Sequence, residues 1–148
     1  MTDYKLLLAQ AEALTEGISR VNANLCNISA LLFYSLEDIN WAGFYFKDGE
    51  DLVLDVFQGR PACVRLKKGR GVCQKAFMSG KVVNVRDVHA FPGHIACDSA
   101  SKSEIVLPLF KDGEVVGVLD IDSPVPDRFD ETDERELSKL ASFVEQLI

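Results

Sequence analysis

The chain has 148 residues, of which 47% are hydrophobic and 26% charged, and its formal net charge is −7. This length and composition suit one globular domain with its own hydrophobic core, so we expect a single domain over residues 1–148. The negative charge disfavours nucleic acid or an anionic membrane as a partner, and the apolar runs are too short to span a bilayer. Because no secretory signal is visible, we expect a cytoplasmic protein.

Residues 1–38 are predicted to form a helical N-terminal part. Apolar side chains recur there at helical spacing, first at Leu7, Ala11, Leu14 and Ile18, and then at Val21, Leu25, Ile28, Leu32 and Leu36. Cys26 lies beside the second stripe. Since free cysteine is among the most buried residue types, we expect Cys26 to be a small core side chain.

From Asn40 the apolar period changes to two, which predicts strands. Two hairpins are expected, one around Asp48-Gly49 and one around Asp112-Gly113, each flanked by alternating or apolar segments. Between them we expect a short helix from Gly71 to Met78 and a short strand from Val82 to Val85. A last helix over residues 130–148 begins at an N-cap that is either Asp130 or Thr132. This order predicts an α+β domain with helices packed on a mostly antiparallel sheet.

Three of the four cysteines fall outside the strongly periodic segments: Cys63, Cys73 and Cys97. Cys73 is in the first turn of a predicted helix, where the helix dipole favours a thiolate. Cys97 lies in an irregular loop from His89 to Glu104, and such loops often carry chemistry. Cysteines at turns are hard to assign to core packing, so we favour thiol redox chemistry, with one attacking cysteine and one or two resolving partners.

Zinc is the alternative for these cysteines, with either His89 or His94 as a fourth ligand. Structural zinc sites usually contain ligands paired at close spacing, whereas these cysteines are single residues far apart in the chain. We therefore expect no metal or cofactor. The two histidines could assist thiol ionisation or stabilise the loop by hydrogen bonds.

Acidic residues provide a second chemical signal at the end of a predicted apolar strand. Asp120 and Asp122 are two positions apart, which places both on one face of the strand. With a plain two-residue turn at Asp112-Gly113, Glu104 would pair with Ile121 and lie on the other face. We predict a bulged three-residue turn, or an equivalent twist, that brings Glu104 beside Asp120.

Such a cluster would have two chemical consequences. Carboxylates that share a poorly solvated site cannot all ionise easily, so the pKa of at least one rises and it can donate a proton near neutrality. The same negative field would bind an ammonium group. Trp41 and Tyr45, on one predicted strand, either wall this pocket with flat apolar surface or are ordinary core aromatics.

These residues belong to motifs that closely resemble the free methionine-(R)-sulfoxide reductases, which are GAF-domain enzymes. The matching segments are Asn40–Tyr45, Gln58–Cys63, Gly71–Cys73, His89–Ser101 and Gly117–Pro124. The resemblance implies a GAF-like fold of about six antiparallel strands, with helices packed on one face and a ligand pocket on the other. It also implies reduction of free L-methionine-(R)-sulfoxide to L-methionine, with thioredoxin as the reductant.

The resemblance further implies roles for individual residues. Cys97 corresponds to the nucleophile, Cys63 to the principal resolving cysteine and Cys73 to a third cysteine. Trp41 corresponds to an aromatic residue against the substrate methyl group. The pocket acids correspond to Glu104, Asp120 and Asp122. We expect Glu104 and Asp122 near the sulfoxide oxygen and Asp120 near the ammonium group. The sequence departs from the family pattern after Cys73, where Gln74 and Phe77 stand in place of smaller residues.

Two other functions remain as alternatives. A non-catalytic GAF sensor that binds a small ligand would leave the three loop cysteines unexplained, and the acids would repel a phosphate-bearing ligand. A zinc-binding structural module would contain stoichiometric metal. The sequence is also compatible with a homodimer.

Overall fold

The computed structural model describes residues 1–93 and 100–148. One sheet is built from six antiparallel strands in the order β3-β2-β1-β6-β5-β4. The strands are β1 (Trp41–Asp48), β2 (Asp51–Gly59), β3 (Arg65–Leu66), β4 (Val83–Val85), β5 (Ser103–Lys111) and β6 (Glu114–Ser123). The two-residue strand β3 was not predicted, because so short a segment has no readable periodicity.

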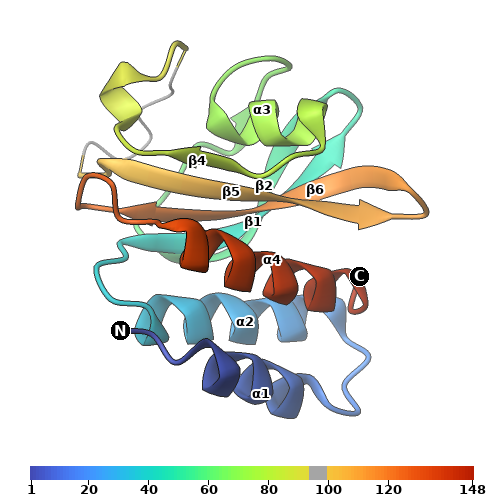
Figure 1. Cartoon of the computed structure of the whole chain (residues 1–148). Helices are drawn as coiled ribbons and strands as arrows, with labels where there is room; N and C mark the ends of the chain where they lie inside the picture. The colour runs from blue at the N-terminus through green and yellow to red at the C-terminus, as the bar shows by residue number, and fades with distance from the viewer. Residues whose placement is uncertain (94–99) are drawn as a thin grey trace.

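Helices cover the two faces of the sheet unequally (Figure 1). On one face lie α1 (Tyr4–Thr15), α2 (Val21–Ser35) and α4 (Glu131–Glu145), while α3 (Val72–Ser79) lies on the other. A short 3₁₀ turn, η1 (Val88–Ala90), follows β4 on the α3 side. The predicted α+β class, with helices packed on an antiparallel sheet, is confirmed. No helix within residues 1–93 and 100–148 has the length and apolarity needed to cross a membrane.

The face toward α1, α2 and α4 holds the larger hydrophobic core. Alternate residues of the central strands point into it, among them Phe44, Ile105, Leu119 and Ile121, all fully buried. Because side chains alternate across a strand, their neighbours Glu104, Asp120 and Asp122 point to the opposite face. The same two strands therefore supply both a hydrophobic core and a polar site.

Four expectations about the N-terminal helices are wrong, and one of them concerns Val21, the first residue of α2, which is 36% exposed. Cys26 is exposed, because it follows Leu25 and is rotated by about 100° from the buried stripe of α2. Leu14 and Ile18 are also exposed, at 42% and 44%, and α1 ends at Thr15 before Ile18 is reached. The buried residues of α1 are Leu7, Ala11 and Thr15.

Helix ends follow the capping signals of the sequence. Asp130 accepts a hydrogen bond from the backbone N–H of Asp133, and the Asp133 side chain accepts one from the N–H of Asp130, forming a capping box for α4. Of the two predicted N-caps, Asp130 is thus the one used. Helix α3 ends at Gly80 in the left-handed conformation, with φ 67°.

The β5–β6 hairpin contains the predicted change of register, but at a different place. Its turn has two residues, Asp112 and Gly113, both with positive φ, and Lys111 pairs with Glu114. The shift occurs further along, where Leu109 pairs with Gly117 but Phe110 pairs with Val115, so that Val116 is the extra residue of a bulge. Glu104 consequently pairs with Asp122 and lies on the same face as Asp120.

Candidate active site

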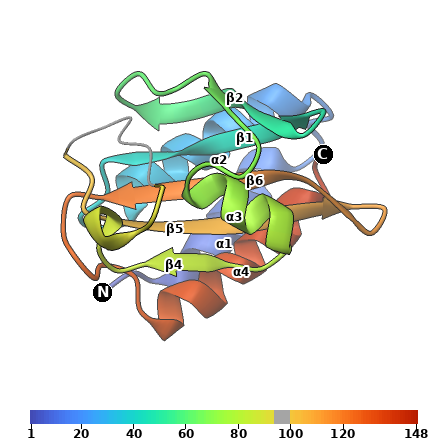
Figure 2. The same ribbon diagram turned by 90° about the horizontal axis from the view of Figure 1, so that it is seen from above.

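A cavity lies between α3 and the sheet, on the face opposite the large core. Trp41 and Tyr45 of β1 form one wall, and residues 61–62 and 70–73 form another. Glu104, Asp120 and Asp122 reach it from β5 and β6. Viewed from above, α3 crosses over these two strands (Figure 2). The cavity thus combines an aromatic wall with a group of acids.

The aromatic wall is held by hydrogen bonds and close backbone contacts. The indole N–H of Trp41 donates to the carbonyl of Arg60 at 3.1 Å, and the Tyr45 hydroxyl donates to the carbonyl of Cys63 at 3.0 Å. The two rings stack with centroids 5.9 Å apart. A Cβ at Gly43 would lie 2.9 Å from Trp41 Cη2, so only glycine fits beneath the indole. Trp41 and Tyr45 are therefore pocket residues with fixed orientations.

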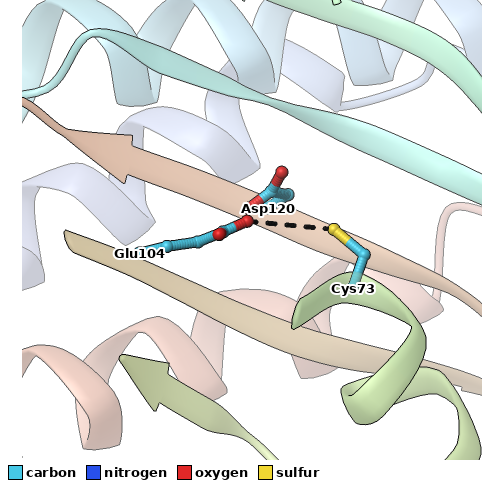
Figure 3. A group of neighbouring side chains, drawn as sticks. All are labelled: Cys73, Glu104 and Asp120. Atoms are coloured by element: carbon cyan, nitrogen blue, oxygen red, sulfur yellow. Dashed lines mark hydrogen bonds between the residues drawn. The ribbon is translucent and has the colours of Figure 1, made fainter. Parts of the chain in front are cut away.

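The buried acids and a thiol converge from three different elements. The Sγ atom of Cys73 on α3 and carboxyl oxygens of Glu104 on β5 and Asp120 on β6 all lie within 4.8 Å of one another (Figure 3). The thiol donates a long hydrogen bond of 4.0 Å to Glu104 Oε2. Glu104 is 6% exposed and Asp120 5%, whereas Asp122 is half-buried. The structure thus brings together the predicted acids and Cys73.

Burial and mutual repulsion change the protonation of this cluster. Burial, followed by the charge of Asp120 and a hydrogen bond with it, raises the pKa of Glu104 well above its usual range. Burial and the charge of Asp122 raise the pKa of Asp120 to about 8. Glu104 is therefore a neutral carboxylic acid near pH 7 and can donate a proton to a bound ligand.

The pKa of the Cys73 thiol is raised, contrary to expectation. The N-terminal turn of α3 favours a thiolate, but burial and the charges of Asp120 and Glu104 raise the pKa well above its ordinary value. Cys73 is fully enclosed against acidic groups, which sequence spacing could not reveal. Near neutral pH it is a protonated thiol.

The other predicted site cysteines occupy different positions. Cys63 is half-buried and disulfide-bonded. A disulfide sulfur cannot act as a thiolate ligand for zinc. The predicted nucleophile Cys97 and the neighbouring His94 lie outside the described residues. His89 is exposed, and its ring Nδ1 and its backbone N–H both contact Asp87 Oδ1, at 3.2 and 3.0 Å. For His89 the observed contacts correspond to the loop-stabilising alternative.

Gln74, which departs from the family pattern, anchors α3 beside the cavity. Its amide nitrogen donates to the carbonyls of Leu66 and Glu50, at 3.0 and 3.2 Å, and its oxygen accepts from the N–H of Gly69. The side chain is fully buried. The Gln74 side chain therefore ties the first turn of α3, which carries Cys73, to the β1–β2 turn and to β3.

Sequence reasoning missed several residues that line the cavity. Arg70 and Ser101 reach it from two loops, and Asn40 Nδ2 donates to Ser101 Oγ at 3.2 Å. Both residues fall in or beside the quoted motifs, but no periodicity or spacing gives them a role. Arg70 brings a positive charge to a cavity whose described lining also carries the carboxyl groups of Glu104, Asp120 and Asp122.

Comparisons with known proteins agree with this geometry. A family model described as the GAF domain matches residues 22–148. Protein YtsP of Bacillus subtilis (strain 168) is 60% identical over 148 residues, covering 99% of this chain and 91% of that protein. The free methionine-R-sulfoxide reductase of Escherichia coli (strain K12) is 52% identical over 145 residues, covering 98% and 88%.

A solved structure gives a similar picture. The X-ray structure of the free methionine-R-sulfoxide reductase from Neisseria meningitidis, in complex with its substrate, superimposes with a TM-score of 0.93. It shares 46% sequence identity and covers 97% of this chain and 87% of that chain. The similarity therefore extends over nearly the whole length of both proteins.

Proposed function

The chain belongs to the GAF-domain family of free methionine-R-sulfoxide reductases, and from this membership we propose how its own residues carry out the reaction. The substrate is free L-methionine-(R)-sulfoxide and the product is L-methionine. The observation that carries the proposal is the buried Glu104 beside Asp120, in a cavity walled by Trp41 and Tyr45.

The cavity suits the three parts of this substrate. Asp122 provides negative charge for the ammonium group, Asp120 ionises when that bound cation lowers its raised pKa, and Arg70 provides positive charge for the carboxylate. The flat surface of Trp41 suits the methyl group of the sulfoxide. Methionine sulfoxide within a polypeptide has neither charged backbone group, so this cavity selects the free amino acid.

Glu104 addresses the chemical difficulty of the reaction. A sulfoxide is a poor electrophile until its oxygen is protonated or hydrogen-bonded. Glu104 carries the required proton near neutral pH because its pKa is raised. It donates to the sulfoxide oxygen, with Asp122 as its neighbour across the strand pair.

Cys97 is the proposed nucleophile and Cys63 its resolving partner. The Cys97 thiolate attacks the sulfoxide, methionine leaves, and Cys97 retains the oxygen as a sulfenic acid. The Cys63 thiol then condenses with it, giving a disulfide and releasing water. An external dithiol, thioredoxin, reduces the disulfide and restores both thiols. The disulfide-bonded state of Cys63 supports its role as a residue that cycles through a disulfide.

Single-turnover and steady-state assays test these roles. Cys97→Ser should release no methionine, even in one turnover with dithiothreitol. Cys63→Ser should release one equivalent of methionine but lose cycling with thioredoxin, thioredoxin reductase and NADPH. Cys26→Ser, which changes an exposed cysteine remote from the cavity lining, is the matched control and should keep both activities. If Cys97→Ser releases methionine, the nucleophile is a different residue.

A further inference from the structure

Cys73 lies beside Glu104 and Asp120 in the cavity, although the proposed reaction gives the Cys73 thiol no step. Their sulfur and two carboxyl oxygens face one another from α3, β5 and β6, and each residue is buried (Figure 3). Asp120 is 5% exposed, and among the described residues its Oδ1 has no hydrogen-bond partner. Because Asp120 lines the cavity, this unpartnered oxygen is available to a cation that enters it.

The three donor atoms match the preferences of one class of metal ion. Zn²⁺ binds thiolate sulfur at about 2.3 Å and carboxylate oxygen at about 2.0–2.2 Å, and accepts three protein ligands with an open fourth position. Tetrahedral ligation at those lengths separates sulfur from oxygen by about 3.6 Å. The observed separations, within 4.8 Å, are larger than this by about 1 Å or less, so the three ligands would close on the ion as it binds. Mg²⁺ and Ca²⁺ are disfavoured because they prefer oxygen ligands throughout.

We propose that Cys73, Glu104 and Asp120 form a three-ligand site for Zn²⁺, and that the bound ion reversibly inhibits the enzyme by occupying the acidic end of the substrate cavity. The fourth position faces the cavity and takes a water molecule. Zn²⁺ binds cysteine as the thiolate and the acids as carboxylates, so binding of the ion releases protons. The inhibition rests on the proposed function, whereas the binding of the ion does not.

A variant in which Cys73 is the only cysteine tests the site without interference from other thiols. With the changes Cys26→Ser, Cys63→Ser and Cys97→Ser, Cys73 is the single remaining cysteine. Co²⁺ serves as a spectroscopic probe for Zn²⁺. We expect one Co²⁺ per chain, with sulfur-to-cobalt charge-transfer absorption that Zn²⁺ displaces. Adding Cys73→Ser should abolish that absorption. If the Cys73-only variant is folded by circular dichroism and shows no such absorption, the site does not exist.

Neighbouring aspartates on β6 provide a matched pair of substitutions. Asp120→Asn removes a proposed ligand and should weaken Zn²⁺ binding at least tenfold by calorimetry. Asp122→Asn makes the same change on the same strand face, but Asp122 is outside the ligand group, so the loss should be below threefold. Equal losses in the two variants would show general electrostatic attraction and would overturn the assignment of Asp120 as a ligand.

Competition with the product distinguishes the site from the proposed function. Saturating L-methionine should weaken Zn²⁺ binding to the Cys73-only variant at least tenfold, because both need Asp120. If Zn²⁺ binds at one equivalent but L-methionine does not weaken it, the metal site is correct and the shared cavity is wrong. If the wild-type enzyme turns over the sulfoxide and Zn²⁺ does not inhibit it, the inhibitory role is wrong while the proposed function stands.

Discussion

The two faces of the sheet use the same strands for different purposes. On the face toward α1, α2 and α4, residues such as Ile121 and Leu119 are apolar and fully buried. On the face toward α3, their direct neighbours Asp120 and Glu104 are almost as buried but ionisable. Burying apolar groups stabilises the fold, whereas burying carboxyl groups costs free energy. Adjacent residues of β6 therefore serve different purposes: one stabilises the core and the next contributes to the chemistry of the cavity.

The largest effect on stability is expected on the helical face. Ile121→Ala removes a fully buried side chain that packs in the large core. The free energy of unfolding should fall by about 3 kcal/mol, since a cavity remains. Urea denaturation measures this change. Activity per folded molecule should stay close to wild type at low temperature. A loss of activity in molecules that remain folded would show that the two faces do not have separate roles.

At Asp120, one residue from Ile121, we expect a large loss of activity with little loss of stability. Asp120→Asn removes a carboxyl group that ionises beside the bound ammonium group of the substrate, so kcat/KM should fall by roughly 100-fold, mainly through KM. Because Asp120 is already largely protonated at pH 6, its unfolding free energy there should change little. Steady-state kinetics and urea denaturation of the same sample measure both. A large loss of stability at pH 6 would show that Asp120 is structural.

The pH dependence of the unfolding free energy should also differ between the two faces. The pKa of Asp120 is raised from 3.8 to about 8, so the folded state holds a proton that the unfolded chain has released. Stability from this group is fully present below pH 4 and is lost as the pH rises toward 8. Denaturation from pH 5 to pH 9 should show this decline. The decline should be shallower in Asp120→Asn, whereas Ile121→Ala should lower the whole curve without changing its slope.

The smallest effect is expected at the start of α4, which packs only on the helical face. Asp130→Ala removes the side chain that caps this helix through the N–H of Asp133. Loss of an N-cap should lower the free energy of unfolding by about 1 kcal/mol. Thermal denaturation measures this change, and KM should remain unaltered. A changed KM would mean that the helical layer and the cavity are coupled.

The sequence predicted the elements well where local signals were strong. The hairpins follow from Asp-Gly turns, and the last helix follows from the capping signal at Asp130. The exposed face of α1 was missed because α1 stops at Thr15, so the apolar stripe does not continue to Ile18. The stop signal is Gly17, with φ 71°, which apolar periodicity alone overlooks.

The site was predicted in composition but only partly in protonation and geometry. The family motifs supplied Trp41 and the acids, and the alternation of strand residues placed Asp120 and Asp122 on one face. The pKa of Cys73 was mispredicted because its neighbours Glu104 and Asp120 come from distant strands. The position of the bulge at Val116 could not be predicted either, because Val115, Val116 and Gly117 have the sequence of an uninterrupted strand.

The register of β6 beyond this bulge limits where the chain can gain or lose a residue during evolution. The tip of the β5–β6 hairpin, at Asp112-Gly113, can absorb an added or lost residue within its turn while the strands keep their pairing. A single insertion or deletion between Gly117 and Asp120 cannot be absorbed in this way, because it exchanges the two faces of the strand end. Asp120 and Asp122 would then enter the hydrophobic core, and Leu119 and Ile121 would face the cavity. Tolerance to length variation should therefore fall sharply within a few residues of one hairpin.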